Sequence, residues 1–197
     1  MRIDHQVIKN WITPKARVLD LGCGDGTLLR QLTDELFIHG YGIEINQENI
    51  LRCVEINVNV IEQNLDEGLS NFDDHSFDTV IMSQTIQTMH NPDKVLNEML
   101  RIGRQGIVTF PNFANWRARW HLMWKGRMPV SEHMPYEWYN TPNIHFCTIS
   151  DFEVLCQEMG IHILNRVVLG HRGSTPLVES LPNFFAETAV YHLSKQS

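Results

Sequence analysis

Three glycines and two acids lie close together near the start of the chain, at Asp20, Gly22, Gly24, Asp25 and Gly26. Glycine lets a backbone turn sharply, and it lets a ligand approach the main chain to contact distance. Phosphate groups prefer backbone amides and a positive field, so carboxylates beside the glycines disfavour a dinucleotide. The pattern therefore indicates a nucleotide-type ligand that carries positive charge in place of phosphate.

A further acid, Glu44, ends a short apolar segment about twenty residues after the first glycine. A carboxylate there can accept hydrogen bonds from both hydroxyls of a ribose, and such charge-assisted bonds contribute roughly 1.5–3 kcal/mol. The alternative is that Glu44 only begins the next helix. S-adenosylmethionine fits both features, because it has an ammonium group, a sulfonium and a ribose diol but no phosphate.

Strands and helices that would hold these residues alternate along the chain. Apolar runs predict strands over residues 17–21, 40–44, 58–62, 77–83 and 106–110. Helical spacing predicts helices over residues 3–12, 28–36, 46–56 and 92–103, the first of them packed on the sheet near the glycines. A helix over 150–159 and strands over 161–169 and 188–193 complete the pattern. We therefore expect an α/β fold with a doubly wound, mostly parallel seven-stranded sheet.

Ligands of open α/β sheets lie outside the carboxyl ends of the strands. Asn64 and Leu65 follow the third strand, so we expect them to meet an adenine ring. Ile45 follows Glu44, and Ser83 ends the fourth strand. The expected cofactor-binding residues are Asp20, Gly22, Cys23, Gly24, Gly26, Glu44, Ile45, Asn64, Leu65 and Ser83.

The segment from Leu19 to Gly26 resembles the first motif of the class I S-adenosylmethionine-dependent methyltransferases, whose second strand ends in an acid like Glu44. The resemblance implies a Rossmann-like fold that binds S-adenosylmethionine or S-adenosylhomocysteine. In that family the position of Asn64 is often Asp, which reads the adenine amino group. An amide keeps an acceptor but adds a donor, so this contact departs from the family pattern.

A stretch of unusual composition, residues 111–148, follows the fifth strand within what we expect to be a single domain, residues 1–197. It holds four of the five tryptophans, and three of them, Trp116, Trp120 and Trp124, recur at helical spacing. A core-facing aromatic stripe, a substrate lid, a nucleic-acid surface and a partner surface are alternatives. Trp, Tyr and Arg are enriched at interface hot spots, which favours a partner surface slightly over a lid.

The same insertion narrows the resemblance. The segments 126–129, 134–139 and 141–145 are similar to the methionine biosynthesis protein MetW family, and the similarity extends to residues 60–63 and 103–113. This implies a methyltransferase-like fold that works with homoserine O-acyltransferase in methionine synthesis. Two functions stay open: an accessory subunit that supports the acyltransferase and senses S-adenosylmethionine, and an active small-molecule methyltransferase.

Composition disfavours several other classes. A net charge of −7 opposes nucleic acid as a partner, and the Asn/Asp-Pro-Pro-aromatic motif of many nucleic-acid methyltransferases is absent after the fourth strand. The ten histidines and four cysteines show no metal-ligand or disulfide spacing. We expect no membrane partner, and a soluble, cytoplasmic protein, because no secretory or membrane-spanning pattern appears. We assign no catalytic residue, although His133, Tyr139 and His145 lie in the insertion.

Overall fold

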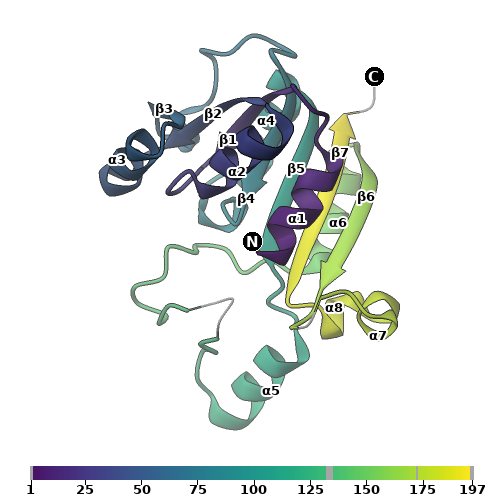
Figure 1. Cartoon of the computed structure of the whole chain (residues 1–197). Helices are drawn as coiled ribbons and strands as arrows, with labels where there is room; N and C mark the ends of the chain where they lie inside the picture. Colours follow the sequence, from purple (N-terminus) through teal and green to yellow (C-terminus); the bar gives the residue numbers. More distant parts are fainter. Residues whose placement is uncertain (1, 132–134, 172, 196–197) are drawn as a thin grey trace.

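The computed structural model describes residues 2–131, 135–171 and 173–195. One seven-stranded sheet has the order β3-β2-β1-β4-β5-β7-β6 (Figure 1). The strands are β1 (Arg17–Leu21), β2 (His39–Glu44), β3 (Asn59–Glu62), β4 (Phe77–Ser83), β5 (Gly103–Pro111), β6 (Ile161–Leu169) and β7 (Thr188–Lys195). The helices are α1 (Ile3–Trp11), α2 (Thr27–Leu36), α3 (Gln47–Glu55), α4 (Pro92–Ile102), α5 (Trp116–Lys125), α6 (Ile149–Glu158), α7 (Pro176–Ser180) and α8 (Pro182–Phe185), with short 3-10 helices η1 (Leu65–Glu67) and η2 (Ile86–Thr88).

The first five strands are parallel, whereas β7 runs antiparallel to β5, and β6 runs antiparallel to β7. The expected doubly wound, mostly parallel sheet of seven strands is thus confirmed, with a mixed edge. The carboxyl ends of β1, β2, β3, β4 and β5 meet at one edge of the sheet. The residues after these strands are therefore placed side by side, as a ligand site requires.

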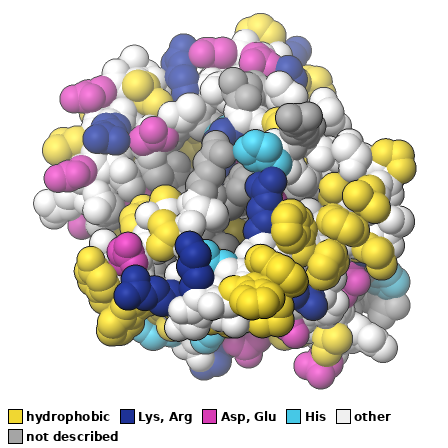
Figure 2. Space-filling view, turned by 90° about the horizontal axis from the view of Figure 1, so that it is seen from below, with side chains coloured by type: hydrophobic (Ala, Val, Ile, Leu, Met, Phe, Trp, Pro, Cys, Tyr) yellow, Lys and Arg dark blue, Asp and Glu magenta, His cyan; other side chains and the backbone are white. Residues whose placement is uncertain are grey.

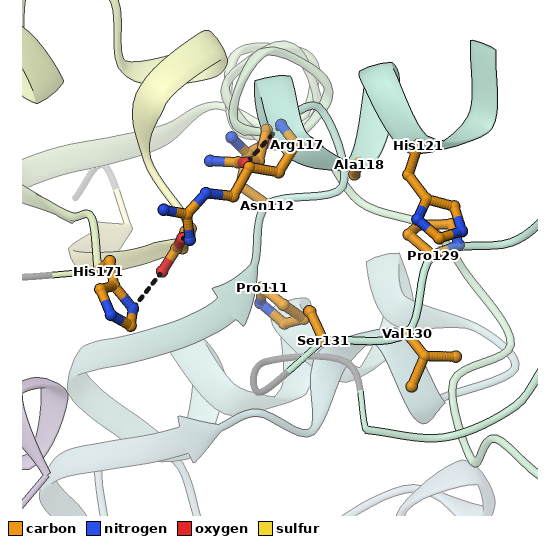
Figure 3. A pocket seen from close by; sticks show the side chains of 11 residues that line it. Pro111, Asn112, Arg117, Ala118, His121, Pro129, Val130, Ser131 and His171 are labelled. Carbon is orange, nitrogen blue, oxygen red and sulfur yellow. Dashed lines mark hydrogen bonds and ion pairs between the residues drawn. The ribbon is translucent and has the colours of Figure 1, made fainter. Parts of the chain in front are cut away.

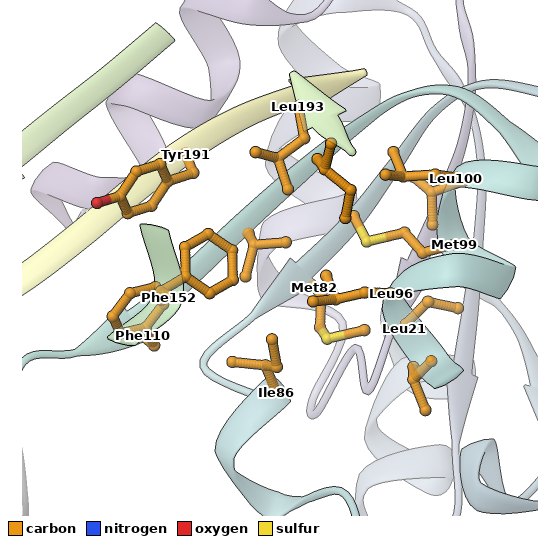
Figure 4. Packing of buried hydrophobic residues seen from close by; sticks show 14 of the residues in the cluster. Leu21, Met82, Ile86, Leu96, Met99, Leu100, Phe110, Phe152, Tyr191 and Leu193 are labelled. Atoms are coloured by element: carbon orange, nitrogen blue, oxygen red, sulfur yellow. The ribbon is translucent and has the colours of Figure 1, made fainter. Parts of the chain in front are cut away.

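Both faces of the sheet are covered, because the central strands are apolar on each side. Val80 and Met82 of β4 belong to a cluster with α4 and α6, whereas Ile81 between them joins a second cluster with α1, α2 and α3. Figure 4 shows the first cluster, in which the rings of Phe110 and Tyr191 each lie within 6 Å of a neighbouring ring. The sheet therefore forms a rigid frame for the loops at its edge.

The N-terminal helix α1 packs on the sheet, as expected. Its Trp11 ring stacks on His192 of β7 with ring centroids 5.3 Å apart. An ion pair between Lys9 and Glu35 ties α1 to α2, the helix that follows the glycines. No helix in the described part of the chain is both long and apolar enough to cross a membrane.

Several element boundaries differ from the sequence prediction by one to three residues, most of all the start of β5, and two short helices were not predicted. Strand β5 begins at Gly103, earlier than expected, because a side chain there would meet Val80 at 2.6 Å and only glycine lets the strand start against β4. Helices α7 and α8 were not expected, because five and four residues are too few to show a helical period. Each begins with a proline, Pro176 or Pro182, which is typical of a first helical turn.

The insertion leaves the sheet after Pro111 and extends beyond its edge, with α5 as its only long helix within the described residues (Figure 1). Its base is closed by a hydrogen bond from Phe113 N to Cys147 O, 3.0 Å, and by contact of the Phe113 and Phe146 rings. The return segment is fixed to η2, because the N–H groups of Ile144 and His145 both donate to Gln87 O.

Helix α5 presents its apolar face to solvent. Only Ala118 is buried, while Trp120 and Trp124 are 56% and 69% exposed. The core-facing alternative for the aromatic stripe is therefore wrong. Exposed aromatic side chains gathered on one helix are typical of interaction sites.

Candidate functional site

The three glycines of the loop between β1 and α2 all have left-handed backbone conformations, with φ of +76°, +56° and +76° at Gly22, Gly24 and Gly26. A side chain at Gly22 would meet Thr85 at 2.6 Å, and one at Gly26 would meet the Cys53 sulfur at 2.8 Å. At Gly24 no atom lies within 4 Å of an added Cβ. The loop is thus closely packed at both ends and open in the middle, where a ligand can approach the main chain.

Glu44 at the end of β2 is in direct contact with this loop. Its Oε2 accepts a hydrogen bond from Gly24 N at 2.9 Å, and its Oε1 accepts from Ile45 N and Asn46 N, each at 2.9 Å. The two halves of the predicted motif are therefore brought together. A carboxylate accepts about four hydrogen bonds, so most of this capacity is already used by the backbone.

Asp20 lies beneath the loop and is only 2% exposed. Its Oδ1 has no hydrogen-bond partner. Burial, and then the nearby charge of Glu44, raise the pKa of Asp20 to about 7. A buried carboxylate in this state favours a cationic or hydrogen-bond-donating group beside it.

The other loop acid, Asp25, is exposed and has a local role. Its Oδ1 accepts a hydrogen bond from Thr27 N at 3.0 Å, at the start of α2. Burial raises the pKa of Asp25, but the hydrogen bonds from Thr27 outweigh it and leave the pKa below the usual value. Of the two acids beside the glycines, Asp20 is thus the buried one with an unpartnered oxygen.

The thiol of Cys23 is buried between the loop and the neighbouring strand. It packs against β2 at Gly42 and lies 3.9 Å from the Cys53 thiol, which donates to Gly24 O at 3.3 Å. Burial raises the pKa of both thiols. Cys23 can therefore offer a ligand only its backbone, while its side chain supports the loop from below.

The expected adenine contacts follow β3, as predicted, but Asn64 is engaged. Its Oδ1 caps η1 by accepting from Asp66 N at 3.1 Å, and its Nδ2 lies 3.4 Å from Glu67 Oε1. Leu65 is buried in the core at 6% exposure, and Ile45 is 60% exposed beside Glu44. The Ser83 hydroxyl lies 3.4 Å from that of Thr109.

Sequence reasoning missed the role of the residues after β4. Thr85 is 8% exposed and packs on Gly22, and Gln84 has a left-handed backbone with φ of +58°. Gln84 N is held by the Thr109 hydroxyl at 3.1 Å. Strained backbone of this kind clusters at functional sites. The position directly after a buried parallel strand was the signal that could have found them.

The candidates in the insertion have no assigned role in the structure. Tyr139 is 70% exposed, His145 is exposed, and His133 falls outside the described residues. Within residues 2–131, 135–171 and 173–195, no group of three or more His, Cys, Asp or Glu side chains is arranged to hold a metal ion.

A cavity of about 250 Å³ lies under α5, between Pro111, His121, Val130 and the end of β6 (Figure 3). Arg117 reaches across it and donates to Glu187 Oε1 at 3.0 Å, and His171 Nδ1 lies 4.0 Å from the other oxygen of that carboxylate. These contacts hold α5 to the start of β7.

Arg117, which is paired with Glu187, is less available to bind the phosphate groups of a nucleic acid. Besides Arg117, Arg119 donates to Ala114 O and lies over the Phe184 ring at 5.6 Å. We therefore predict no specific binding of duplex or single-stranded nucleic acid, and weak binding through Lys125 or Arg127 should vanish with added salt. An electrophoretic mobility shift that persists at high salt would contradict this prediction.

Solved structures of low sequence identity share this fold. A S-adenosylmethionine-dependent methyltransferase from Archaeoglobus fulgidus has a TM-score of 0.69 at 15% identity, covering 97% of this chain and 94% of that one. The cyclase SpnF has a TM-score of 0.69 at 17% identity, covering 97% and 80%. Because proteins described as a methyltransferase and as a cyclase are both alike in fold, the fold alone does not specify the reaction.

A curated relative is closer in sequence. The bifunctional methionine biosynthesis protein MetXA/MetW of Rhodopirellula baltica is 35% identical over 207 residues, which cover 100% of this chain. The chain spans 33% of the length of that relative. The family described as methionine biosynthesis protein MetW matches residues 2–193, and this chain therefore belongs to the MetW family.

Proposed function

We propose that this chain is an accessory subunit that binds S-adenosylmethionine or S-adenosylhomocysteine and supports a homoserine O-acyltransferase in methionine synthesis. The exposed aromatic face of α5 is the observation that carries the proposal, because an exposed apolar patch of this kind is typical of a protein-binding surface. In this view residues 1–197 form one domain, and the insertion at 111–148 is its docking element.

The residues at the glycine loop fit the cofactor chemically. The unpartnered Oδ1 of buried Asp20 suits the ammonium group, and the open space at Gly24 suits a ligand lying against the main chain. Glu44 is the acceptor for the ribose hydroxyls, which would take over part of its hydrogen bonding from the backbone. The adenine would then lie near Ile45, Asn64 and Leu65, and Ser83 would border the loop from β4.

Replacing Glu44 by Ala should weaken binding of S-adenosylhomocysteine about ten- to a hundredfold, because a charge-assisted contact worth roughly 1.5–3 kcal/mol is lost. Isothermal calorimetry measures the change. Glu62→Ala is the matched control, since Glu62 is an exposed glutamate that ends the neighbouring strand β3 in register with Glu44. Absence of heat from the wild type, after bound ligand has been stripped, would end the cofactor assignment.

The docking surface is built from two chain segments. We define the aromatic face as Trp116, Trp120, Met123 and Trp124 of α5 with Leu177 of α7, Phe184 of α8 and Leu181 between these two helices, all of them 40% exposed or more. Arg119 joins the two parts through its contact with Phe184. Figure 2 shows hydrophobic side chains gathered on this side of the molecule, with basic side chains beside them. Aromatic anchors with neighbouring arginines are typical of interface hot spots.

The relative from Rhodopirellula baltica supports the choice of partner. Its name joins MetXA to MetW, and about two thirds of it lie outside the match to this chain. Two proteins that are fused in one polypeptide often work together. We therefore propose that the aromatic face binds the acyltransferase. Mixing the two purified proteins and testing whether they elute together in size-exclusion chromatography checks this pairing.

A further inference from the structure

A second cleft, of about 650 Å³, lies between the start of α1, η2, the return segment of the insertion, the end of β6 and the start of β7. Its lining includes Arg2, Asp4, Gln87, Asn143 and His171. None of these residues belongs to the predicted cofactor set. The cleft nevertheless adjoins the glycine loop, because Thr85, directly before η2, packs on Gly22.

Gln87, which lines this cleft, has a side-chain oxygen without a hydrogen-bond donor. It is 4% exposed, and its Nε2 donates to Gln84 O at 3.0 Å, which fixes the orientation of the amide because only the nitrogen can donate. The opposite atom, Oε1, is buried and has no hydrogen-bond partner. A buried acceptor without a donor destabilises the fold, so a ligand that donates there would gain binding free energy.

The rest of the lining has both signs of charge. Asp4 is 5% exposed, and it accepts from Arg2 Nε and Nη2 at 3.2 and 2.7 Å and from His5 N at 3.1 Å. Arg2 is exposed, and two of its five N–H groups are engaged by Asp4, which leaves the others available to a carboxylate. Acceptors therefore lie on the buried side of the cleft and a guanidinium at its mouth.

We propose that this cleft binds a small zwitterion of the α-amino acid type. The ligand ammonium donates to Gln87 Oε1 with the Asp4 carboxylate beside it, and the ligand carboxylate faces Arg2. A purely anionic molecule would meet the charge of Asp4, and a purely cationic one would meet Arg2. The site goes beyond the proposed function, because it requires neither the cofactor nor the acyltransferase.

The test is a thermal-shift screen of the whole chain with the twenty common L-amino acids, followed by calorimetry on the strongest. Two matched compounds serve as controls: the amine that lacks the carboxylate of that amino acid, and the acid that lacks its ammonium group. We expect the amino acid to raise Tm and to bind at least about tenfold more tightly than either matched compound, since each loses one charge-assisted contact. Failure of every amino acid to bind at about 10 mM would overturn the proposal.

Variants locate the site. Gln87→Met keeps the side-chain length but removes both the unpartnered acceptor and the Nε2 donor to Gln84 O, so affinity for the amino acid should fall at least about tenfold. Tm without ligand, measured on the same variant, reports the cost of the lost Gln84 contact separately. Gln157→Met, on the exposed side of α6, is the control and should change neither. Unchanged affinity in Gln87→Met would contradict the assignment.

Arg2→Met is a second variant that should fold normally even if Gln87→Met does not, since Arg2 is exposed. It should lower the affinity for the amino acid but not the affinity for the matched amine. An equal loss of affinity for both compounds would refute the proposed arrangement of charges. Binding of S-adenosylhomocysteine to Arg2→Met, measured by calorimetry, should stay unchanged. Loss of that heat in the wild type would end the cofactor proposal and leave this one standing.

Discussion

Replacing Trp120 and Trp124 together by Ala is expected to weaken association with the acyltransferase by at least about a hundredfold. Hot-spot aromatic side chains contribute roughly 2 kcal/mol or more each, and these two rings lie 5.5 Å apart on the exposed side of α5. Tm should hardly change, because the side chains are 56% and 69% exposed. Co-purification and thermal unfolding of the same variant measure both quantities.

Two further variants separate docking from folding. Leu51→Ala, 64% exposed on α3 at the opposite edge of the sheet, should leave association unchanged. Phe152→Ala, 1% exposed, should lower stability by roughly 3–5 kcal/mol, as aromatic truncations in cores do. If the double Trp variant keeps its partner and melts early, the aromatic face is structural and the docking proposal is wrong.

Ligand and partner should also be coupled. If the subunit senses S-adenosylmethionine, bound ligand changes affinity for the acyltransferase, and the acyltransferase changes affinity for the ligand by the same factor. Acyltransferase activity that responds neither to this chain nor to the ligand would refute the subunit proposal. The small-molecule methyltransferase would then become the leading interpretation.

The second large effect concerns Asp20. Its pKa is about 7 in the folded chain and near 3.8 when unfolded, so between these values the folded state holds a proton that the unfolded state releases. The free energy of unfolding should therefore fall as pH rises from about 4 to about 7, by an amount on the order of 4 kcal/mol from this group. Asp20→Asn should remove this slope, which urea unfolding at a series of pH values measures.

Asp25→Asn is the matched control, because the folded-state pKa of Asp25 is lowered and its contribution has the opposite sign. Asp25 stabilises the fold above its unfolded pKa and loses that contribution as pH falls. Parallel stability curves for wild type and Asp20→Asn would show that Asp20 ionises normally. S-adenosylmethionine should also bind more tightly at pH 7 than at pH 6, since Asp20 ionises across this range while an α-ammonium, with a pKa of roughly 7.7–8.0, stays mostly charged.

The sequence predicted the elements that depend on local pattern. The glycines at 22, 24 and 26 need left-handed backbone, and the apolar run of β4 needs burial on both faces, so each could be inferred from a few neighbouring residues. The sequence placed Glu44 at the edge where parallel strands end, but it did not predict the hydrogen bond that Glu44 accepts from Gly24 N.

The remaining features depend on contacts between distant residues. Spacing placed the three tryptophans on one side of a helix but did not say which side faces the sheet, and Arg117 decides this by its contact with Glu187. Asn64 was expected to meet a ligand, yet a cap for η1 uses the same oxygen. The unpaired amide of Gln87 became visible only when α1, η2 and the insertion were seen around it.

Because β7 pairs with β5, the aromatic face cannot be complete until the end of the chain has been synthesised. Pro111, which leads into α5, pairs with Thr188, which follows α8, so the two parts of the face join only when the last strand is in place. A ribosome-bound or C-terminally truncated chain has α5 without α7, α8 and β7, and so offers an incomplete surface. Recognition by the acyltransferase would therefore select chains that have finished folding.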